Sequence, residues 1–277
     1  MQPKRVYGTA EDLIRAIDEY LLWLRENTGR ISIPVEINWD GDNGNILRLS
    51  GAGKCPRQTA YGKHYPEDAE ELSARALNVF IHGDILHAKE RELIRRVTYL
   101  HGEEERVEFP LGGGHPNVIG HIDGRIFLGE QQHILDIKSV NTRGFKEALS
   151  VGPRQDYIDQ LNAYMEATGV HHAVLWMYNK DTSHRAAVTL GYDADRAQAI
   201  RERFISVLKS TPDSLPDRMF EPQWEISRGK RTGREYLPWN CGYCAFVDKC
   251  WADTGFEMVF EKGKPRWIRA NEKEEGA

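Results

Sequence analysis

One segment of the chain, residues 118–140, constrains the fold more than any other. It reads VIGHIDGRIFLGEQQHILDIKSV, in which two apolar-rich runs are joined by GEQQ. Short apolar runs bounded by turn residues predict the two antiparallel strands of a β-hairpin. Because side chains two residues apart lie on the same face of a strand, Asp136 and Lys138 should stand side by side, with Ile137 turned toward the core. Asp123, on the preceding strand, should lie within side-chain reach of both.

The flanking segments predict alternating helices and strands. Helical spacing of apolar residues is expected over 9–27, from Pro66 through residue 96, over 154–168 and over 194–210, and strands over 172–180 and 185–192. DGDNGN, residues 40–45, predicts a turn. From Pro212 the chain is loop-rich and ends in a charged tail, NEKEEGA. The order indicates an α/β core with a separate C-terminal module.

Composition sets limits on the class of protein. The chain has 277 residues with 40% hydrophobic and 29% charged, which is typical of a soluble globular protein. No run approaches the roughly 20 apolar residues that cross a bilayer, and the N-terminal residues lack the apolar core of a signal peptide, so no membrane contact and a cytoplasmic location are expected. The net charge of −5 means that nucleic-acid binding would need a local basic groove.

The residues around the hairpin favour metal-assisted hydrolysis. Two converging carboxylates, from Asp123 and Asp136, form a hard-oxygen site suited to Mg²⁺ or Mn²⁺, and the Lys138 ammonium can orient a water and stabilise negative charge. The plainer interpretation is a solvated strand face, because an acid-x-Lys triplet arises by chance about once or twice in a chain of this length.

Two helical segments add candidates. His87 lies in GDILHAKE, and imidazole is a competent ligand for Mn²⁺, although a lone helical His is more often structural. Gln160 and Tyr164 stand at i and i+4 and therefore on one helix face. An ordinary amphipathic helix with a solvated Gln160 and a half-buried Tyr164 would explain the same spacing.

Taken in order, His87, GHIDG, LDIKS and the Gln160-x-x-x-Tyr164 helix resemble the RecB-like branch of the PD-(D/E)XK nucleases. The match covers roughly residues 80–165, and Ile122 stands where the family name has proline. The resemblance implies a restriction-endonuclease-like core, a central mixed sheet flanked by helices. It assigns metal binding to His87, Asp123, Asp136 and the Ile137 carbonyl, catalysis to Asp123, Asp136 and Lys138, and DNA contacts to Gln160 and Tyr164.

The four cysteines form a second pattern. Cys241, Cys244 and Cys250 are packed into CGYCAFVDKC, whereas Cys55 lies far upstream. Disulfides are rare in cytosolic proteins, and thiolates favour zinc or iron–sulfur clusters over hard ions. One thiolate before a nuclease core and three after it resemble the iron–sulfur staple of the CRISPR-associated and AddB-type relatives, which implies a [4Fe–4S] cluster. A structural zinc and four unligated thiols remain alternatives.

These observations predict three segments: a helical region over 1–78 that includes the first cysteine, a nuclease core over 79–211, and a cysteine-stapled module with a tail over 212–277. The expected activity is Mg²⁺- or Mn²⁺-dependent exonuclease cleavage of single-stranded DNA or DNA ends in recombination, repair, CRISPR adaptation or phage DNA metabolism. No phosphate-binding loop of the Gly-x-x-x-x-Gly-Lys-Ser/Thr type is present, so the chain is not a self-contained helicase–nuclease.

DNA should then be the principal partner, with Arg143 and Arg154 among the basic residues that contact its backbone. Lys54, Arg57 and Lys63 near the first cysteine are further basic candidates. Protein partners of a recombination or CRISPR adaptation complex and a homo-oligomer are both compatible with the sequence. Two rival interpretations are a catalytically inactive DNA-binding or complex-forming subunit that keeps a structural Fe–S or Zn site, and a zinc-stapled interaction domain.

Overall fold

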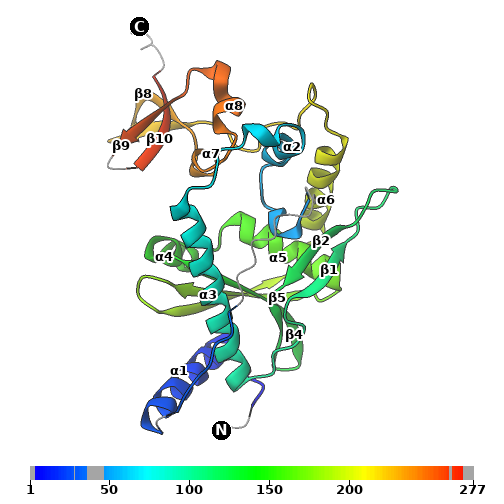
Figure 1. Ribbon diagram of the computed structural model, residues 1–277, viewed down its shortest axis with the longest axis vertical. Helices are drawn as coiled ribbons and strands as arrows, with labels where there is room; N and C mark the ends of the chain where they lie inside the picture. The colour runs from blue at the N-terminus through cyan, green and yellow to red at the C-terminus, as the bar shows by residue number, and fades with distance from the viewer. Residues whose placement is uncertain (1–3, 28, 36–46, 262–263, 271–277) are drawn as a thin grey trace. The chain divides into compact units, whose positions relative to one another are not determined.

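The computed structural model describes residues 4–27, 29–35, 47–261 and 264–270 (Figure 1). The chain divides into two compact units, one formed by residues 1–53 and 72–205 and the other by residues 54–71 and 206–277. This division differs from the three expected segments, because residues 54–71 join the C-terminal part of the chain. The turn expected over 40–45 lies outside the described residues. None of the helices in the described ranges combines the length and apolar composition that crossing a bilayer requires.

The first unit contains one mixed sheet, a separate strand pair and most of the helices. Its helices are α1 (Ala10–Glu26), α3 (Ala74–Val97), α4 (Thr142–Ser150), α5 (Gln155–Thr168) and α6 (Ala194–Lys209), whose last turn belongs to the second unit, with a 3₁₀ turn η1 (Leu49–Gly51). Its strands are β1 (Glu105–Phe109), β2 (Val118–Ile122), β3 (Gly124–Leu128), β4 (Gln131–Val140), β5 (His172–Asn179) and β6 (Arg185–Gly191).

The mixed sheet has the strand order β3-β4-β5-β6, and β1 pairs separately with β2. Strands β3 and β4 form the expected antiparallel hairpin, whereas β4 and β5 run parallel, with Asp136 opposite Leu175 and Lys138 opposite Met177. Seven consecutive residues of β5 are buried, as expected for a strand covered on both faces. Helices α4 and α5 form the crossover between the two parallel strands, which a parallel connection requires.

The two faces of β4 have different roles. Leu135 and Ile137 belong to a core cluster with residues of α1 and α3, including Leu13 and Ile94. In Figure 1, α1 lies beside the C-terminal half of α3. Because strand side chains alternate, Asp136 is turned to the other face, where α5 packs. The prediction that Ile137 is buried behind the charged pair is confirmed, since its side chain is 1% exposed.

The helix expected from Pro66 is interrupted. Residues Pro66–Asp68 form a 3₁₀ turn, and α3 begins only at Ala74, where the Ser73 hydroxyl accepts a hydrogen bond from the Ala76 amide at 3.2 Å. A serine in this position satisfies an amide that the first turn of a helix leaves unpaired, so the local cap decides the start. The helix expected over 9–27 is confirmed, and Thr9 caps it in the same way through the Asp12 amide.

The second unit corrects the expectation of a loop-rich C-terminal region. Its four-stranded antiparallel sheet has the order β7-β8-β10-β9. The strands are β7 (Gln223–Ser227), β8 (Lys230–Tyr236), β9 (Glu257–Glu261) and β10 (Lys264–Ala270), and the helices are α2 (Pro56–His64), α7 (Trp239–Gly242) and α8 (Val247–Trp251), with 3₁₀ turns η2 (Pro66–Asp68) and η3 (Ala252–Thr254). These strands are short and half exposed, so their sequences lack the long apolar runs that reveal β4 and β5. The tail NEKEEGA lies outside the described residues.

Candidate active site and cysteine cavity

Strand β4 provides an ion pair at the centre of the candidate site. Lys138 Nζ donates a hydrogen bond to Asp136 Oδ1 at 3.0 Å and lies 2.9 Å from Oδ2. The Oδ2 atom is nevertheless buried and accepts no hydrogen bond of acceptable geometry from any described residue. A buried carboxylate oxygen without a full set of partners carries a desolvation cost, and a bound cation would remove it.

Asp123 reaches the same place from a bend rather than from a strand. Strand β2 ends at Ile122 and β3 begins at Gly124, so the expected strand position of Asp123 is wrong, although its expected proximity to β4 is found. Asp123 Oδ2 accepts a hydrogen bond from the Ile137 amide at 2.6 Å, and Oδ1 lies 3.6 Å from His87 Nδ1 of α3. The bend turns the carboxylate inward while its two neighbours continue in the strands.

Helix α5 supplies a polar pair behind Asp136. Gln160 Nε2 donates to Asp136 Oδ1 at 3.2 Å and contacts the Tyr164 hydroxyl at 3.1 Å. Gln160 is 8% exposed and Tyr164 only 2%, which excludes the solvated Gln160 of the amphipathic alternative. A Cβ at Gly120 of β2 would lie 2.9 Å from the Tyr164 ring, so the glycine allows this close approach. Both side chains therefore support Asp136 from inside the protein.

The electrostatics of the site follow from burial and mutual attraction. Burial raises the pKa of Asp136 above its usual value, against the opposing charge of Lys138. Burial also acts to raise the pKa of Asp123, but His87, Lys138 and the Ile137 amide outweigh it and hold that pKa below its usual value. The two carboxylates outweigh burial at Lys138 and raise its pKa, and Asp123 does the same for the pKa of His87. Asp123 is thus the more acidic of the two carboxyl groups.

An aromatic side chain that the sequence analysis did not single out borders this cluster. The Tyr157 ring centroid lies 5.6 Å from Lys138 Nζ and 4.7 Å from the Arg154 guanidinium carbon. Arg154 also pairs with Asp156, while Arg143 at the start of α4 is exposed. Tyr157 precedes Gln160 by three residues, so the spacing along α5 could have indicated it.

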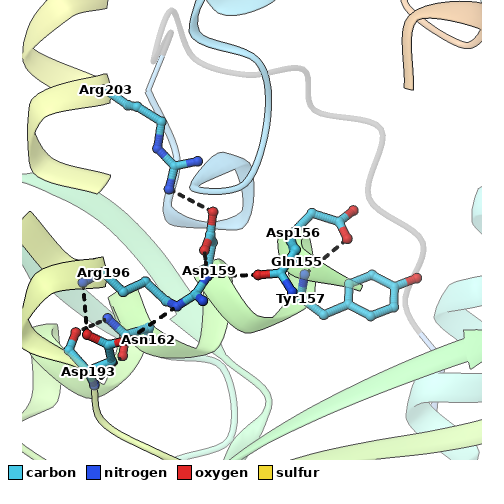
Figure 2. A network of polar contacts seen from close by, with 8 residues as sticks. All are labelled: Gln155, Asp156, Tyr157, Asp159, Asn162, Asp193, Arg196 and Arg203. Atoms are coloured by element: carbon cyan, nitrogen blue, oxygen red, sulfur yellow. Dashed lines mark hydrogen bonds and ion pairs between the residues drawn. The ribbon is translucent and has the colours of Figure 1, made fainter. Parts of the chain in front are cut away.

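The face of α5 opposite Tyr157 is fixed by a polar network (Figure 2). Asp159 pairs with two arginines of α6, with Arg196 and, at 2.7 Å, with Arg203. Asn162 and Asp193 exchange two hydrogen bonds of 2.8 Å through side-chain and backbone atoms. In Figure 2 the Tyr157 ring points away from this network. The network anchors α5 to α6 and leaves the other face of α5 for the candidate site.

The donor atoms suit a hard divalent cation, although they are not arranged around one position. Asp123, Asp136, His87 and the Ile137 carbonyl offer oxygen and imidazole ligands of the kind that Mg²⁺ or Mn²⁺ prefers. Across the residues that the structure describes, no three or more His, Cys, Asp or Glu side chains are placed so that they could hold a metal ion. The carboxylates instead contact Lys138 and His87, and the unsatisfied Asp136 Oδ2 is the atom that a cation would complete.

The four cysteines gather around one cavity of the second unit. Cys55 precedes α2, Cys241 lies in α7, Cys250 lies in α8 and Cys244 lies between these two helices; the cavity wall also includes Trp251. None of the four forms a disulfide. Burial and the neighbouring thiols raise the pKa of Cys241 to about 12 and that of Cys244 to about 11. Without a bound cation the thiols of Cys241 and Cys244 therefore stay protonated at neutral pH.

Two of the expected basic DNA contacts have structural roles instead. Lys63 Nζ lies within 3.1 Å of the carbonyl oxygens of Val207, Leu208 and Ser210, at the C-terminal end of α6. Arg57 lines the cysteine cavity and donates to the Pro216 carbonyl at 3.0 Å. Lys63 therefore interacts with backbone oxygens, and Arg57 interacts with a backbone oxygen and lines the cavity.

No model of a known protein family matches the sequence, and no curated protein matches it. Among solved structures the chain is similar to that of SSO0001, at 20% identity over 83% of this chain and 94% of the other, with a TM-score of 0.48. It is also similar to an alkaline exonuclease from Laribacter hongkongensis, at 19% identity over 57% and 87% of the two chains, with a TM-score of 0.38. For a phage-related exonuclease from Haemophilus somnus the identity is 16% over 59% and 92%, with a TM-score of 0.41. Similarities this distant do not establish a shared function.

Proposed function

We propose that the chain is a Mg²⁺- or Mn²⁺-dependent DNA exonuclease of the RecB-like PD-(D/E)XK type. The observation that carries the proposal is that an Asp136–Lys138 pair and an Asp123–His87 pair adjoin each other on β4, where Asp123 binds the Ile137 amide and a buried Asp136 oxygen lacks a hydrogen bond. Two acids whose pKa values are shifted in opposite directions, beside a lysine and an imidazole, are typical of a functional site.

The proposed division of labour follows the chemistry of each group. Asp123, Asp136, His87 and the Ile137 carbonyl would hold the metal, which supplies Lewis-acid activation of water and of the phosphodiester. Lys138 keeps two N–H donors beyond the one that contacts Asp136, and these can orient a water or a phosphate oxygen. In the proposed reaction a water oxygen bonds to phosphorus while the bond between phosphorus and one bridging oxygen of the DNA backbone breaks. The water loses one proton and the leaving oxygen gains one, so the products are a phosphate monoester and a free hydroxyl group.

Gln160 and Tyr164 are proposed to act on DNA chiefly by holding Asp136 in place. Both side chains are buried and are linked by hydrogen bonds to the Asp136 carboxylate, which supports a positioning role rather than an extensive direct contact with DNA. Arg143 and Arg154 remain the proposed backbone contacts, since exposed guanidinium groups bind phosphate well. The biological setting proposed is recombination, repair, CRISPR adaptation or phage DNA metabolism, in the cytoplasm.

The cysteine cavity is proposed to hold a [4Fe–4S] cluster. Four thiols from distant parts of the chain line one cavity, and a cluster binds each thiolate to a different iron, so the sulfurs need not converge on a single ion. Zinc is the alternative that metal analysis would reveal.

The test compares the full chain with Asp136→Asn and Lys138→Met variants on end-labelled single-stranded DNA in the presence of Mn²⁺. Removal of either group should lower the cleavage rate by at least about 100-fold, because each contributes to charge stabilisation in the transition state. Asp195→Asn, an exposed acid of α6, is the matched control and should cleave like the wild type. Equal activity in all four proteins would refute the proposal. A wild type that binds DNA without cleaving it would favour the inactive DNA-binding subunit.

A further inference from the structure

The wall of the cysteine cavity has an unusual charge composition. Besides the four cysteines it contains two arginines, Arg57 and Arg218, and the other residues that line it are Gln58, Tyr61, Met219, Phe220, Asn240, Val247 and Trp251. Among the described residues of this wall there is no Asp or Glu. Two guanidinium groups therefore stand beside four thiols without a carboxylate in the wall to balance them.

Both arginines are tied to the segment that carries Cys250. Arg218 Nη2 donates to the Cys250 carbonyl at 2.5 Å, and its guanidinium carbon lies 4.2 Å from the Trp251 ring centroid. The Arg57 guanidinium lies 5.7 Å from the Tyr61 ring centroid and interacts with the Cys250 side chain. These contacts hold both side chains against the cavity rather than in bulk water.

Each arginine also has one buried N–H group without a hydrogen-bond partner among the described residues. The Nε atoms of Arg57 and Arg218 are buried and make no hydrogen bond to any described residue. An unsatisfied buried N–H costs about 1–3 kcal/mol, and a charged donor costs more, so such atoms normally have a partner. A cysteine sulfur is only a weak hydrogen-bond acceptor. The wall therefore suits an anionic occupant that accepts hydrogen bonds.

We infer that Arg57 and Arg218 are the counter-cations of an anionic iron–sulfur cluster held by the four cysteines, and that they raise its reduction potential. The inference rests on the cofactor proposed above. An oxidised four-iron core bound by four thiolates carries two negative charges, which two guanidinium groups balance. One-electron reduction adds a third negative charge without breaking a bond. Nearby positive charge and N–H donors stabilise the reduced cluster more than the oxidised one.

The experiment uses the full chain, purified anaerobically and reconstituted with ferrous iron and sulfide. Iron and acid-labile sulfide are measured first, and the midpoint potential is then obtained by titration with dithionite, followed by the spin resonance signal of the reduced cluster. Arg57→Gln and Arg218→Gln should each lower the equilibrium constant for reduction about tenfold, which corresponds to ~59 mV for one electron. Arg57→Lys and Arg218→Lys keep the positive charge and should shift the midpoint potential much less. Arg231→Gln, an exposed arginine of the same unit, should leave it unchanged.

Every outcome bears on the inference. Loss of iron from the Gln variants but not from the Lys variants, with unchanged circular dichroism, would also support it, because the Lys variants keep the positive charge that the Gln variants lose. Unchanged potentials in both Gln variants, equal loss of iron from the Gln and Lys variants, or a wild type that contains zinc or no cluster would overturn it. DNA cleavage by the same preparations is scored separately, so failure of this inference is distinguishable from failure of the nuclease proposal.

Discussion

A buried ion pair between α3 and the sheet permits a quantitative prediction about stability. Glu90 is fully buried and accepts hydrogen bonds from Arg185 Nε at 2.8 Å and from the Trp176 indole N–H at 3.1 Å. The Arg185 side chain is 7% exposed, and its one other carboxylate partner among the described residues, Asp18, is 61% exposed. Lys89 Nζ lies 3.1 Å from the second Glu90 oxygen.

The change Glu90→Ala would leave the buried Trp176 indole N–H without its acceptor, and the buried Arg185 guanidinium with only the exposed Asp18 as a carboxylate partner among the described residues. Breaking a buried pair by removing one partner typically costs about 3–5 kcal/mol of the free energy of unfolding. For a unit of this size, each kcal/mol corresponds to about 2–4 °C in Tm, so a decrease of roughly 6–20 °C is expected. The double variant Glu90→Leu with Arg185→Met should recover much of the loss, since it removes both charges together.

The assay is thermal and urea unfolding of the wild type, Glu90→Ala and the double variant, followed by circular dichroism. Glu105→Gln, which removes the acid from a partly exposed pair with Arg125, is the control and should cost less than about 1 kcal/mol. If Glu90→Ala costs no more than this control, the pair does not stabilise the packing of α3 on the sheet. His87 lies one turn before Glu90 on the same helix, so looser packing of this helix should also displace His87. The Glu90→Ala variant should therefore need a higher Mn²⁺ concentration than the wild type to reach its maximal cleavage rate.

Three further predictions concern single side chains. Gln160→Leu should lower the cleavage rate about 10- to 100-fold, because the buried Asp136 carboxylate loses a donor worth about 1.5–3 kcal/mol; a normal rate would exclude positioning by Gln160. Tyr157→Ala should raise KM for single-stranded DNA about 5- to 150-fold if its ring stacks on a base, with Tyr157→Phe near the wild type; equal KM values for all three proteins would contradict this role. Lys63→Met should increase amide hydrogen exchange around residues 207–210 at least about fivefold, because it removes the cation that binds three carbonyls there; unchanged protection would show that the lysine does not cap this end of α6.

The alternation of apolar and polar residues predicted the β-hairpin and the residues that lie beside Asp136. The alternation in LDIKS placed Asp136 and Lys138 on one face and Ile137 in the core, which the structure confirms. Such patterns work because side-chain direction along a strand is fixed by the backbone itself. The same reasoning missed the bend at Asp123, since one residue that leaves a strand does not change the apolar pattern around it.

Contacts between distant residues were decided only by the tertiary structure. The spacing of Gln160 and Tyr164 marked one helix face, but the crossover between β4 and β5 turned that face toward Asp136 and buried it. Arg57 and Lys63 carried the same charge in the sequence as any exposed basic residue. In the structure Arg57 lines a cavity and Lys63 binds the end of a helix, and both contacts involve segments about 150 residues away in the sequence. The local sequence around either residue does not indicate such contacts.

The sequence by itself therefore determined most helices and strands of the first unit and which groups are available for chemistry. Tertiary structure decided which of those groups meet, which lose their water, and hence how acidic each carboxyl group is. The physical reason is that periodicity and capping act over a few residues, whereas burial and charge pairing depend on whatever the fold brings alongside.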